Sequence, residues 1–275
     1  MTRVSKDKLP ENEETKVEAI AEQVEIDETI KPIEEEKIEK TKEEIDTWKP
    51  ITELGRKVKS GEVTDLNTIF DKGWKIKESQ IVDALLDNPL SDLLNIGQSK
   101  GKFGGGKRKA FRQTQKKTQE GNKPKFATYA VIGNKNGFVG LGYGKSKETV
   151  PSREKALRNS KLNVMRLRRG CGSWQCGCKT AHSIPYQVEG KCGSVHVILR
   201  PAPKGTGLKA QKEIQKILLL AGIKDVWSKS SGKTTSAINL IKACEDALKQ
   251  LAQTKVQDRF TENLGVQEGN RVREK

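Results

Sequence analysis

The stretch RRGCGSWQCGCKTAHSIP, residues 168–185, holds the side chains in this chain that are best suited to chemistry. Cys171, Cys176, Cys178 and His182 supply four groups that could hold a tetrahedral zinc ion, with Cys192 as a reserve ligand. Their spacing argues against zinc, because the gaps between the cysteines are four residues and one residue rather than the usual two. Another alternative is a reactive thiol, because neighbouring cations lower the pKa of a thiol. However, no catalytic base at a known spacing accompanies these cysteines.

The favoured interpretation of this stretch is a compact connector that lies on an anionic partner. Arg168, Arg169 and Lys179 would contact phosphate, while Trp174 would pack or stack. The small cysteines would fill tight space between two domains. This interpretation requires no cofactor. Zinc remains possible as an additional ion that would stabilise the loop.

The elements before the connector follow a strand, strand, helix pattern. Residues 126–133 and 138–145 predict two strands joined by the turn NKNG. Alternation in the second strand puts three glycines on one face, where a helix or another backbone can approach closely: Gly140, Gly142 and Gly144. Residues 148–167 then predict a helix with an apolar stripe that recurs every seven residues: Val150, Leu157 and Val164.

The elements after the connector predict a second α/β unit. Strands are expected over 186–190, 194–203 and 223–230, and helices over 212–222 and 236–253. Cys244 falls on the apolar face of the last helix, so we expect it in the core. From Lys255 onward the chain is polar, and we expect it to fray.

Charge is distributed unevenly along the chain. The formal net charge is +16, but residues 1–46 carry −8 and residues 47–275 carry +24. The acidic segment predicts a disordered arm, and the basic body favours nucleic acid as its partner. Residues 47–97 predict short helices, separated at Gly61 and Gly73, that dock on another surface. Residues 98–125 hold ten Lys and Arg residues but only one acidic residue. This composition is typical of a segment that becomes ordered on an RNA backbone.

Several classes of protein are excluded. No apolar run is long enough to span a bilayer and no signal peptide is visible, so a cytoplasmic protein with reduced thiols is expected. The sequences GYGKS and SGKTT are not phosphate-binding loops, because the required first glycine is replaced by Val139 and Trp227. The sequence shows no catalytic constellation, so we predict a protein that is not an enzyme.

Four motifs together resemble the ribosomal protein S5 family of the small subunit, in its archaeal and eukaryotic branch. They are GFVGLGYGKSKETVPSREKALRNSKLNV, RRGCGSWQCGCKTAHSIPYQVEGKCGSV, LRPAPKGTGL and LLLAGIKDVWSKSSGKTT. The resemblance spans about residues 48–253. It implies an α+β or α/β protein with two domains, one similar to double-stranded-RNA-binding folds (108–170) and the S5 C-terminal domain (185–253). The other parts are expected from composition and spacing: an acidic disordered arm (1–46), a docking extension with the basic Gly-rich segment (47–107), the connector (171–184) and a polar tail (254–275).

The resemblance also implies a function. It is that of a structural constituent of the small ribosomal subunit, which binds ribosomal RNA near the mRNA path, lies beside ribosomal protein S4, and supports assembly and translational accuracy. A free double-stranded-RNA-binding regulatory protein is the alternative. The acidic arm and the Gly-rich stretch from Lys102 to Lys109 are not part of the family's general pattern.

The predicted RNA contacts come from five places in the chain. The basic segment offers Lys107, Arg108, Lys109 and Arg112. The family's first hairpin loop corresponds to Lys116, Lys117, Lys123 and Lys125, and its glycine strand with the following turn corresponds to Gly140, Gly142, Gly144, Lys145 and Lys147. The connector offers Arg168, Arg169 and Lys179, and the LRPAPKGTGL motif offers Lys204.

Overall fold

The computed structural model describes residues 47–86, 89–98 and 108–272, without the side chains of residues 258–259 and 271–272. The chain divides into two units, Met1–Lys49 and Pro50–Lys275, and the elements below belong to the second. The predicted acidic arm lies outside the described residues. So do Lys107 and the glycine run before it. In the described ranges, no helix combines the length and the apolarity that crossing a bilayer requires.

Three short helices open the second unit, as the sequence predicted. They are α2 (Glu53–Lys59), α3 (Leu66–Asp71) and α4 (Ser79–Leu85). Both predicted breaks, Gly61 and Gly73, adopt positive φ angles of 81° and 67°. This layer docks within its own unit, because α4 packs on α5 (Thr149–Leu162) and Asp83 pairs with Lys161 at 2.6 Å.

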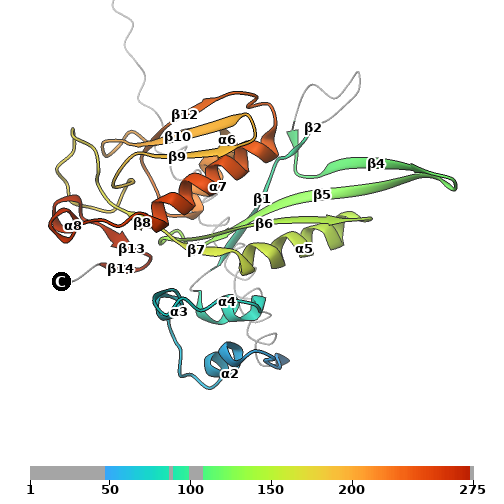
Figure 1. The fold of residues 1–275 in the computed structure, drawn as a ribbon, viewed down its shortest axis with the longest axis horizontal. Coiled ribbons are helices and arrows are strands. Elements are labelled where there is room, and N and C mark those ends of the chain that lie inside the picture. The colour runs from blue at the N-terminus through green and yellow to red at the C-terminus, as the bar shows by residue number, and fades with distance from the viewer. Residues whose placement is uncertain (1–46, 87–88, 99–107, 273–275) are drawn as a thin grey trace, which may run out of the picture. The chain divides into compact units, whose positions relative to one another are not determined.

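The first sheet is antiparallel and has the order β1-β5-β6-β7, with β4 also paired to β5. Its strands are β1 (Leu90–Leu94), β4 (Arg112–Thr118), β5 (Gly121–Gly133), β6 (Phe138–Ser146) and β7 (Val164–Arg166). β1 and β4 share one edge of β5, as Figure 1 shows. Residues 90–94 therefore belong to this sheet, although the sequence placed them in the docking extension.

The glycines of β6 form a seam against α5, as their alternation predicted. A Cβ atom on Gly142 would lie 2.1 Å from the Ser160 nitrogen, so only glycine fits at this helix–strand distance. The predicted helical stripe is wrong. Val150 is 63% exposed and Val164 lies in β7, whereas the buried face of α5 is small: Ser152, Ala156 and Ser160. A close approach to glycine favours small side chains over the long apolar ones that periodicity selects.

The second sheet lies in the C-terminal half and has the order β11-β12-β10-β9. Its strands are β9 (Val188–Cys192), β10 (Val195–Pro201), β11 (Leu208–Lys209) and β12 (Val226–Ser231), with helices α6 (Lys212–Leu220) and α7 (Ala237–Gln253). β11 is parallel to β12, while the other pairs are antiparallel. Cys244 is fully buried in the core, as predicted.

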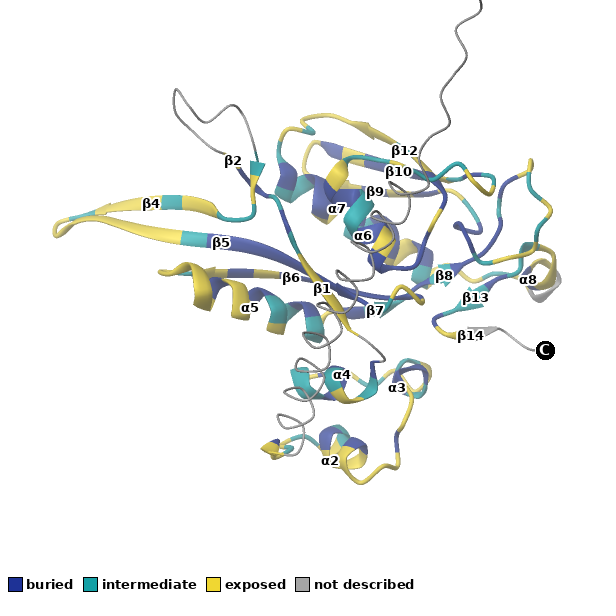
Figure 2. Ribbon diagram, turned by 180° about the vertical axis from the view of Figure 1, so that it is seen from behind, coloured by how far each residue is buried: buried dark blue, intermediate teal, exposed yellow. Residues whose placement is uncertain are grey.

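One hydrophobic core spans both halves of this unit. Tyr129 and Val131 of β5 belong to the same cluster as Val197 of β10 and Leu248 of α7. The alternate residues of β5, such as Ala130, point to the other face of the sheet, towards the glycine seam and α5. Figure 2 shows the inner part of β5 as buried and its outer end as exposed.

The C-terminal tail does not fray in the described range. It forms α8 (Asp258–Leu264), β13 (Gln267–Glu268) and β14 (Arg271–Val272). β13 pairs with β8 (Arg168–Arg169), and Val266 is buried. The prediction of a frayed tail was wrong, because the short polar strand β13 gains order here by pairing with β8, which directly precedes the connector. A second small ribbon joins β2 (Gly97–Gln98) to β3 (Arg108–Lys109).

Candidate nucleic-acid interface and cysteine connector

A two-stranded basic ribbon is formed by β4 and the outer half of β5. β5 pairs with β6 only from Phe126 onward, so Gly121–Lys125 has β4 as its single neighbouring strand. The ribbon runs past the end of β6 in Figure 1. Lys116, Lys117, Lys123 and Lys125 are all exposed on it. They lie on the paired strands, whereas the resemblance had placed them in the loop between them.

The ribbon concentrates like charges. Lys116 lies directly opposite Lys123 in the register, and alternation puts Arg112 and Lys125 on the same face. Directly opposed like charges destabilise a strand pair, and isolated two-stranded hairpins are marginal in water. Glu120 pairs with Lys123 and offsets part of this repulsion. An anionic partner along this face would offset much more.

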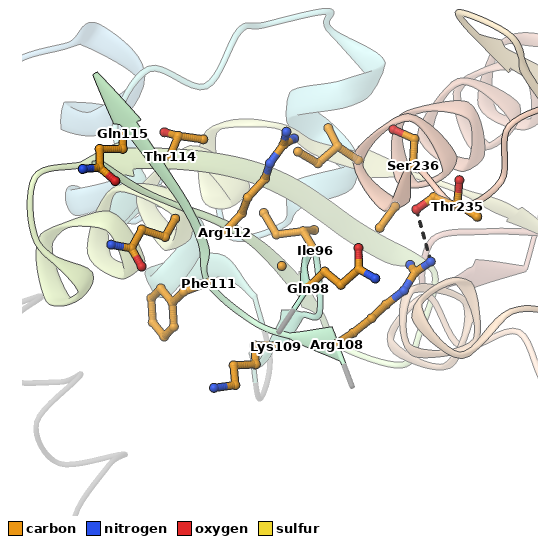
Figure 3. Close-up of a pocket in the computed structure, with 14 residues that line it drawn as sticks. Ile96, Gln98, Arg108, Lys109, Phe111, Arg112, Thr114, Gln115, Thr235 and Ser236 are labelled. Atoms are coloured by element: carbon orange, nitrogen blue, oxygen red, sulfur yellow. Dashed lines mark hydrogen bonds between the residues drawn. The ribbon is translucent and has the colours of Figure 1, made fainter. Parts of the chain in front are cut away.

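Two hollows gather further cations beside the ribbon. One is lined by Lys145 and Lys147 together with Lys125, which lies 20 residues before Lys145 in the sequence. The second, shown in Figure 3, is lined by Arg108, Lys109 and Arg112 together with the start of α7. Arg108 extends to the Thr235 carbonyl, where its Nη2 donates at 3.2 Å, whereas Lys109 points the opposite way.

Arg108 and the first turn of α7 leave positive charge in the second hollow. Nη1 of Arg108 is buried without a hydrogen-bond partner in the described part of the chain. The N-terminus of α7 carries partial positive charge, since its first amides have no partner within the helix. Both features favour an anionic group over a cationic one in this hollow.

Five of the predicted RNA contacts have structural roles instead. Arg169 is only 6% exposed, and its Nη2 donates to Asn136 Oδ1 at 2.7 Å and to the Gly269 carbonyl at 3.1 Å. Burial lowers the pKa of this guanidinium. Arg168 is half-buried and its Nε pairs with Glu268 at 2.6 Å. The remaining three are covered by α5 and lie out of reach of a phosphate: Gly140, Gly142 and Gly144.

The connector closes on itself through backbone pairing. Gly170 and Ser183 exchange hydrogen bonds of 2.9 and 3.0 Å across its base. Trp174 at the tip is 88% exposed, so the prediction that it packs is not fulfilled within the described chain. Lys179, which adopts φ 51°, is exposed as expected. The connector is therefore a closed loop that presents an aromatic ring and a cation to its surroundings.

The four candidate metal ligands converge inside this loop. The Sγ atoms of Cys171, Cys176 and Cys178 and a ring nitrogen of His182 all lie within 4.8 Å of one another. Burial raises the pKa of Cys171 to about 11, whereas hydrogen bonds with Thr180 lower the pKa of Cys178 to about 6. The argument from spacing did not foresee this convergence.

Asp225 ties the connector to the second sheet. Its Oδ2 lies 2.8 Å from Nδ1 of His182, and both side chains are buried. Its Oδ1 accepts the backbone N–H groups of Gly205 and Gly207 at 3.1 and 2.8 Å. Sequence reasoning missed Asp225, because it lies 43 residues from His182 and belongs to no local motif.

The predicted contact Lys204 lies in a hollow beside the connector. Lys204 and Lys224 are exposed and line this hollow with residues 180–182 of the loop. Lys224 was also missed by the sequence analysis, since a single lysine before a strand carries no signal. The two side chains add a second basic region at the connector.

Comparison with known proteins matches two segments of the chain to two domain families of one ribosomal protein. Residues 110–168 match the family described as "Ribosomal protein S5, N-terminal domain", and residues 190–259 match "Ribosomal protein S5, C-terminal domain". The protein named "Small ribosomal subunit protein uS5" of Nanoarchaeum equitans is 50% identical over 190 residues, which cover 69% of this chain and 81% of that protein. Its namesake in Methanocaldococcus jannaschii is 43% identical over 189 residues, covering 69% and 80% of the two chains. That of Staphylothermus marinus is 51% identical over 135 residues, covering 49% and 63%.

Proposed function

The chain belongs to the ribosomal protein uS5 family, and we infer from this membership that it is a structural constituent of the small ribosomal subunit and not an enzyme. The match to the Nanoarchaeum equitans protein carries this conclusion, because half of the aligned residues are identical over four-fifths of that protein. As a member of this family the chain binds RNA and serves translation. This function requires no enzymatic cofactor.

We propose that the basic ribbon and the hollows beside it are the ribosomal RNA interface. Structured RNA is recognised mainly through its shape and its phosphates, so exposed Lys and Arg side chains suit it. The ribbon supports the proposal, because its cations face one another without a core beneath them. The proposed contacts are Arg108, Lys109, Arg112, Lys116, Lys117, Lys123, Lys125, Lys145, Lys147, Lys179 and Lys204.

We also propose the finer parts of the family's role. The first domain would act as a fold similar to double-stranded-RNA-binding domains, and its sheet covered on one face by α5 is compatible with that. The chain would lie near the mRNA path beside ribosomal protein S4, and would support assembly and accuracy. These positions rest on the resemblance of the motifs. Crosslinking of the exposed Lys179 and Lys204 in intact subunits tests them, and the expected adducts are RNA and a neighbouring ribosomal protein.

Co-sedimentation of the full chain tests the main proposal. A tagged copy should run with small subunits in a sucrose gradient, at about one copy per subunit, and should leave little in the light fractions. A free RNA-binding regulator would instead stay mostly in the light fractions or vary in stoichiometry. Substoichiometric recovery in subunits from growing cells would contradict a structural role.

A further inference from the structure

We propose that Cys171, Cys176, Cys178 and His182 bind one structural zinc ion, which fastens the connector to the C-terminal sheet. The four ligand atoms come from one short loop and already surround a common point, since none of them is more than 4.8 Å from another. Three thiolates and one imidazole are a ligand set typical of closed structural zinc sites. The proposal does not depend on the RNA interface.

The distances fit the ion with little movement. Zinc–sulfur and zinc–nitrogen bonds of about 2.3 and 2.0 Å in a tetrahedron place neighbouring ligand atoms about 3.5 to 3.8 Å apart. Cys176 Sγ lies 3.8 Å from Nε2 of His182, which is close to that value. All separations are within 4.8 Å, so none would need to shorten by more than about 1 Å, and a change of cysteine rotamer can supply such a shift.

The backbone resolves the objection raised by the spacing. The Cys176 N–H donates to the Ser173 carbonyl at 3.2 Å, so a tight turn brings Cys176 back towards Cys171. Lys179 adopts φ 51°, and the His182 N–H donates to the Thr180 carbonyl at 2.9 Å, so a second turn brings the histidine back towards Cys178. The four-residue gap and the final three-residue gap therefore each span a reversal of the chain.

Asp225 prepares the histidine for a metal. A carboxylate can only accept a hydrogen bond, so the 2.8 Å contact places the proton on Nδ1 and leaves the Nε2 lone pair facing the thiols. A metal-bound histidine almost always donates its other N–H to such a partner, which fixes the ring orientation. Asp225 is itself held by Gly205 and Gly207, so the ion would connect the connector, the 204–207 loop and β12.

Space filling does not explain these cysteines equally well. Cys171 is buried, but Cys176 and Cys178 are half-exposed, and their thiols contact the polar groups of His182 and Thr180. Cysteines that merely fill a core are buried among apolar atoms, as Cys244 is. Zinc with three thiolates carries one net negative charge, and the exposed Lys204 and Lys224 beside the connector would balance it.

Metal analysis of the full chain tests the proposal. The protein is produced without a polyhistidine tag in medium containing zinc and is dialysed, and its metals are then measured by mass spectrometry. We expect about one zinc per chain in the wild type and in Cys192→Ser, which changes a partly exposed cysteine outside the cluster. We expect less than about 0.2 zinc per chain in Cys176→Ser, because a closed structural zinc site uses four protein ligands and a neutral serine hydroxyl does not replace a thiolate. Wild-type protein without zinc, or with iron in its place, would overturn the proposal.

Two further measurements keep the test decisive if Cys176→Ser fails to fold. Cobalt added to metal-free wild type should give the absorption of tetrahedral thiolate coordination, with one equivalent at saturation, and octahedral cobalt spectra would refute the site. Asp225→Asn can still accept the Gly205 and Gly207 amides. It should keep one zinc but weaken zinc binding about 10- to 100-fold in competition with a chelator. Unchanged zinc affinity in this variant would show that Asp225 does not support a metal ligand.

Discussion

Removing the cations from one face of the ribbon should flatten the salt dependence of RNA binding. The change is Arg112, Lys116, Lys123 and Lys125 to Gln, which keeps long polar side chains on the strands. All four side chains are exposed and share a face through the β4–β5 register. The variant should fold, because these residues lie outside the hydrophobic core.

The size of the effect follows from the number of phosphates released. Each neutralised phosphate contributes about 0.7 to 0.9 to the slope of log affinity against log salt, so four contacts contribute about 2.8 to 3.6. Salt rises fourfold between 50 and 200 mM. Over this range the wild type should therefore lose about 50 to 150 times more affinity than the variant does. At low salt the wild type should bind much more tightly, and at high salt the two curves should converge.

Filter binding to small-subunit ribosomal RNA over this salt range measures the slope. The matched control changes four exposed lysines of the C-terminal half to Gln, which removes the same charge away from the ribbon: Lys191, Lys209, Lys229 and Lys242. The control should keep most of the wild-type slope. Parallel lines for the wild type and the ribbon variant, or an equal loss of slope in the control, would refute a specific role for the ribbon.

Three other changes test structural roles. Gly142→Ala should lower the free energy of unfolding by about 1 to 3 kcal/mol in urea titrations, because its Cβ would overlap α5, whereas Gly177→Ala, with open space around it, should change little. Arg169→Ala should lower the free energy of unfolding by about 1 to 3 kcal/mol, because it leaves the Asn136 and Gly269 acceptors unpaired. It should leave the salt dependence of RNA binding unchanged. A reduced slope would show that Arg169 contacts RNA after all. Truncation after Leu264 should lower Tm, because it removes the buried Val266 and the Glu268 partner of Arg168, and an unchanged Tm would contradict the ordered tail.

Local patterns in the sequence were enough to predict several features of the fold. The alternating glycines of β6 predicted a close approach because a strand's period depends only on its own backbone. The breaks at Gly61 and Gly73 were visible for the same reason, since both residues adopt positive φ angles. The apolar position of Cys244 likewise followed from the period of its own helix.

Features that depend on distant partners were not visible. Arg169 looked like a phosphate contact, but Asn136 and Gly269 bury it, and no local signal joins those positions. The stripe predicted for α5 failed because the opposing glycines, rather than the helix itself, decide which side chains fit. The cysteine spacing was a poor guide because two chain reversals, not the number of intervening residues, set the distances between the ligands.

The core shared by the two sheets has a consequence during synthesis. Val131 and Leu141 emerge early, but the core cluster to which they belong extends to Leu251 of α7. At about 5 to 20 residues per second, the ribosome needs about 5 to 20 seconds to complete that interval. Throughout it, the nascent first domain presents an uncovered apolar sheet face, which is a target for chaperones and a risk for aggregation. The shared core is therefore complete only when the final long helix has emerged.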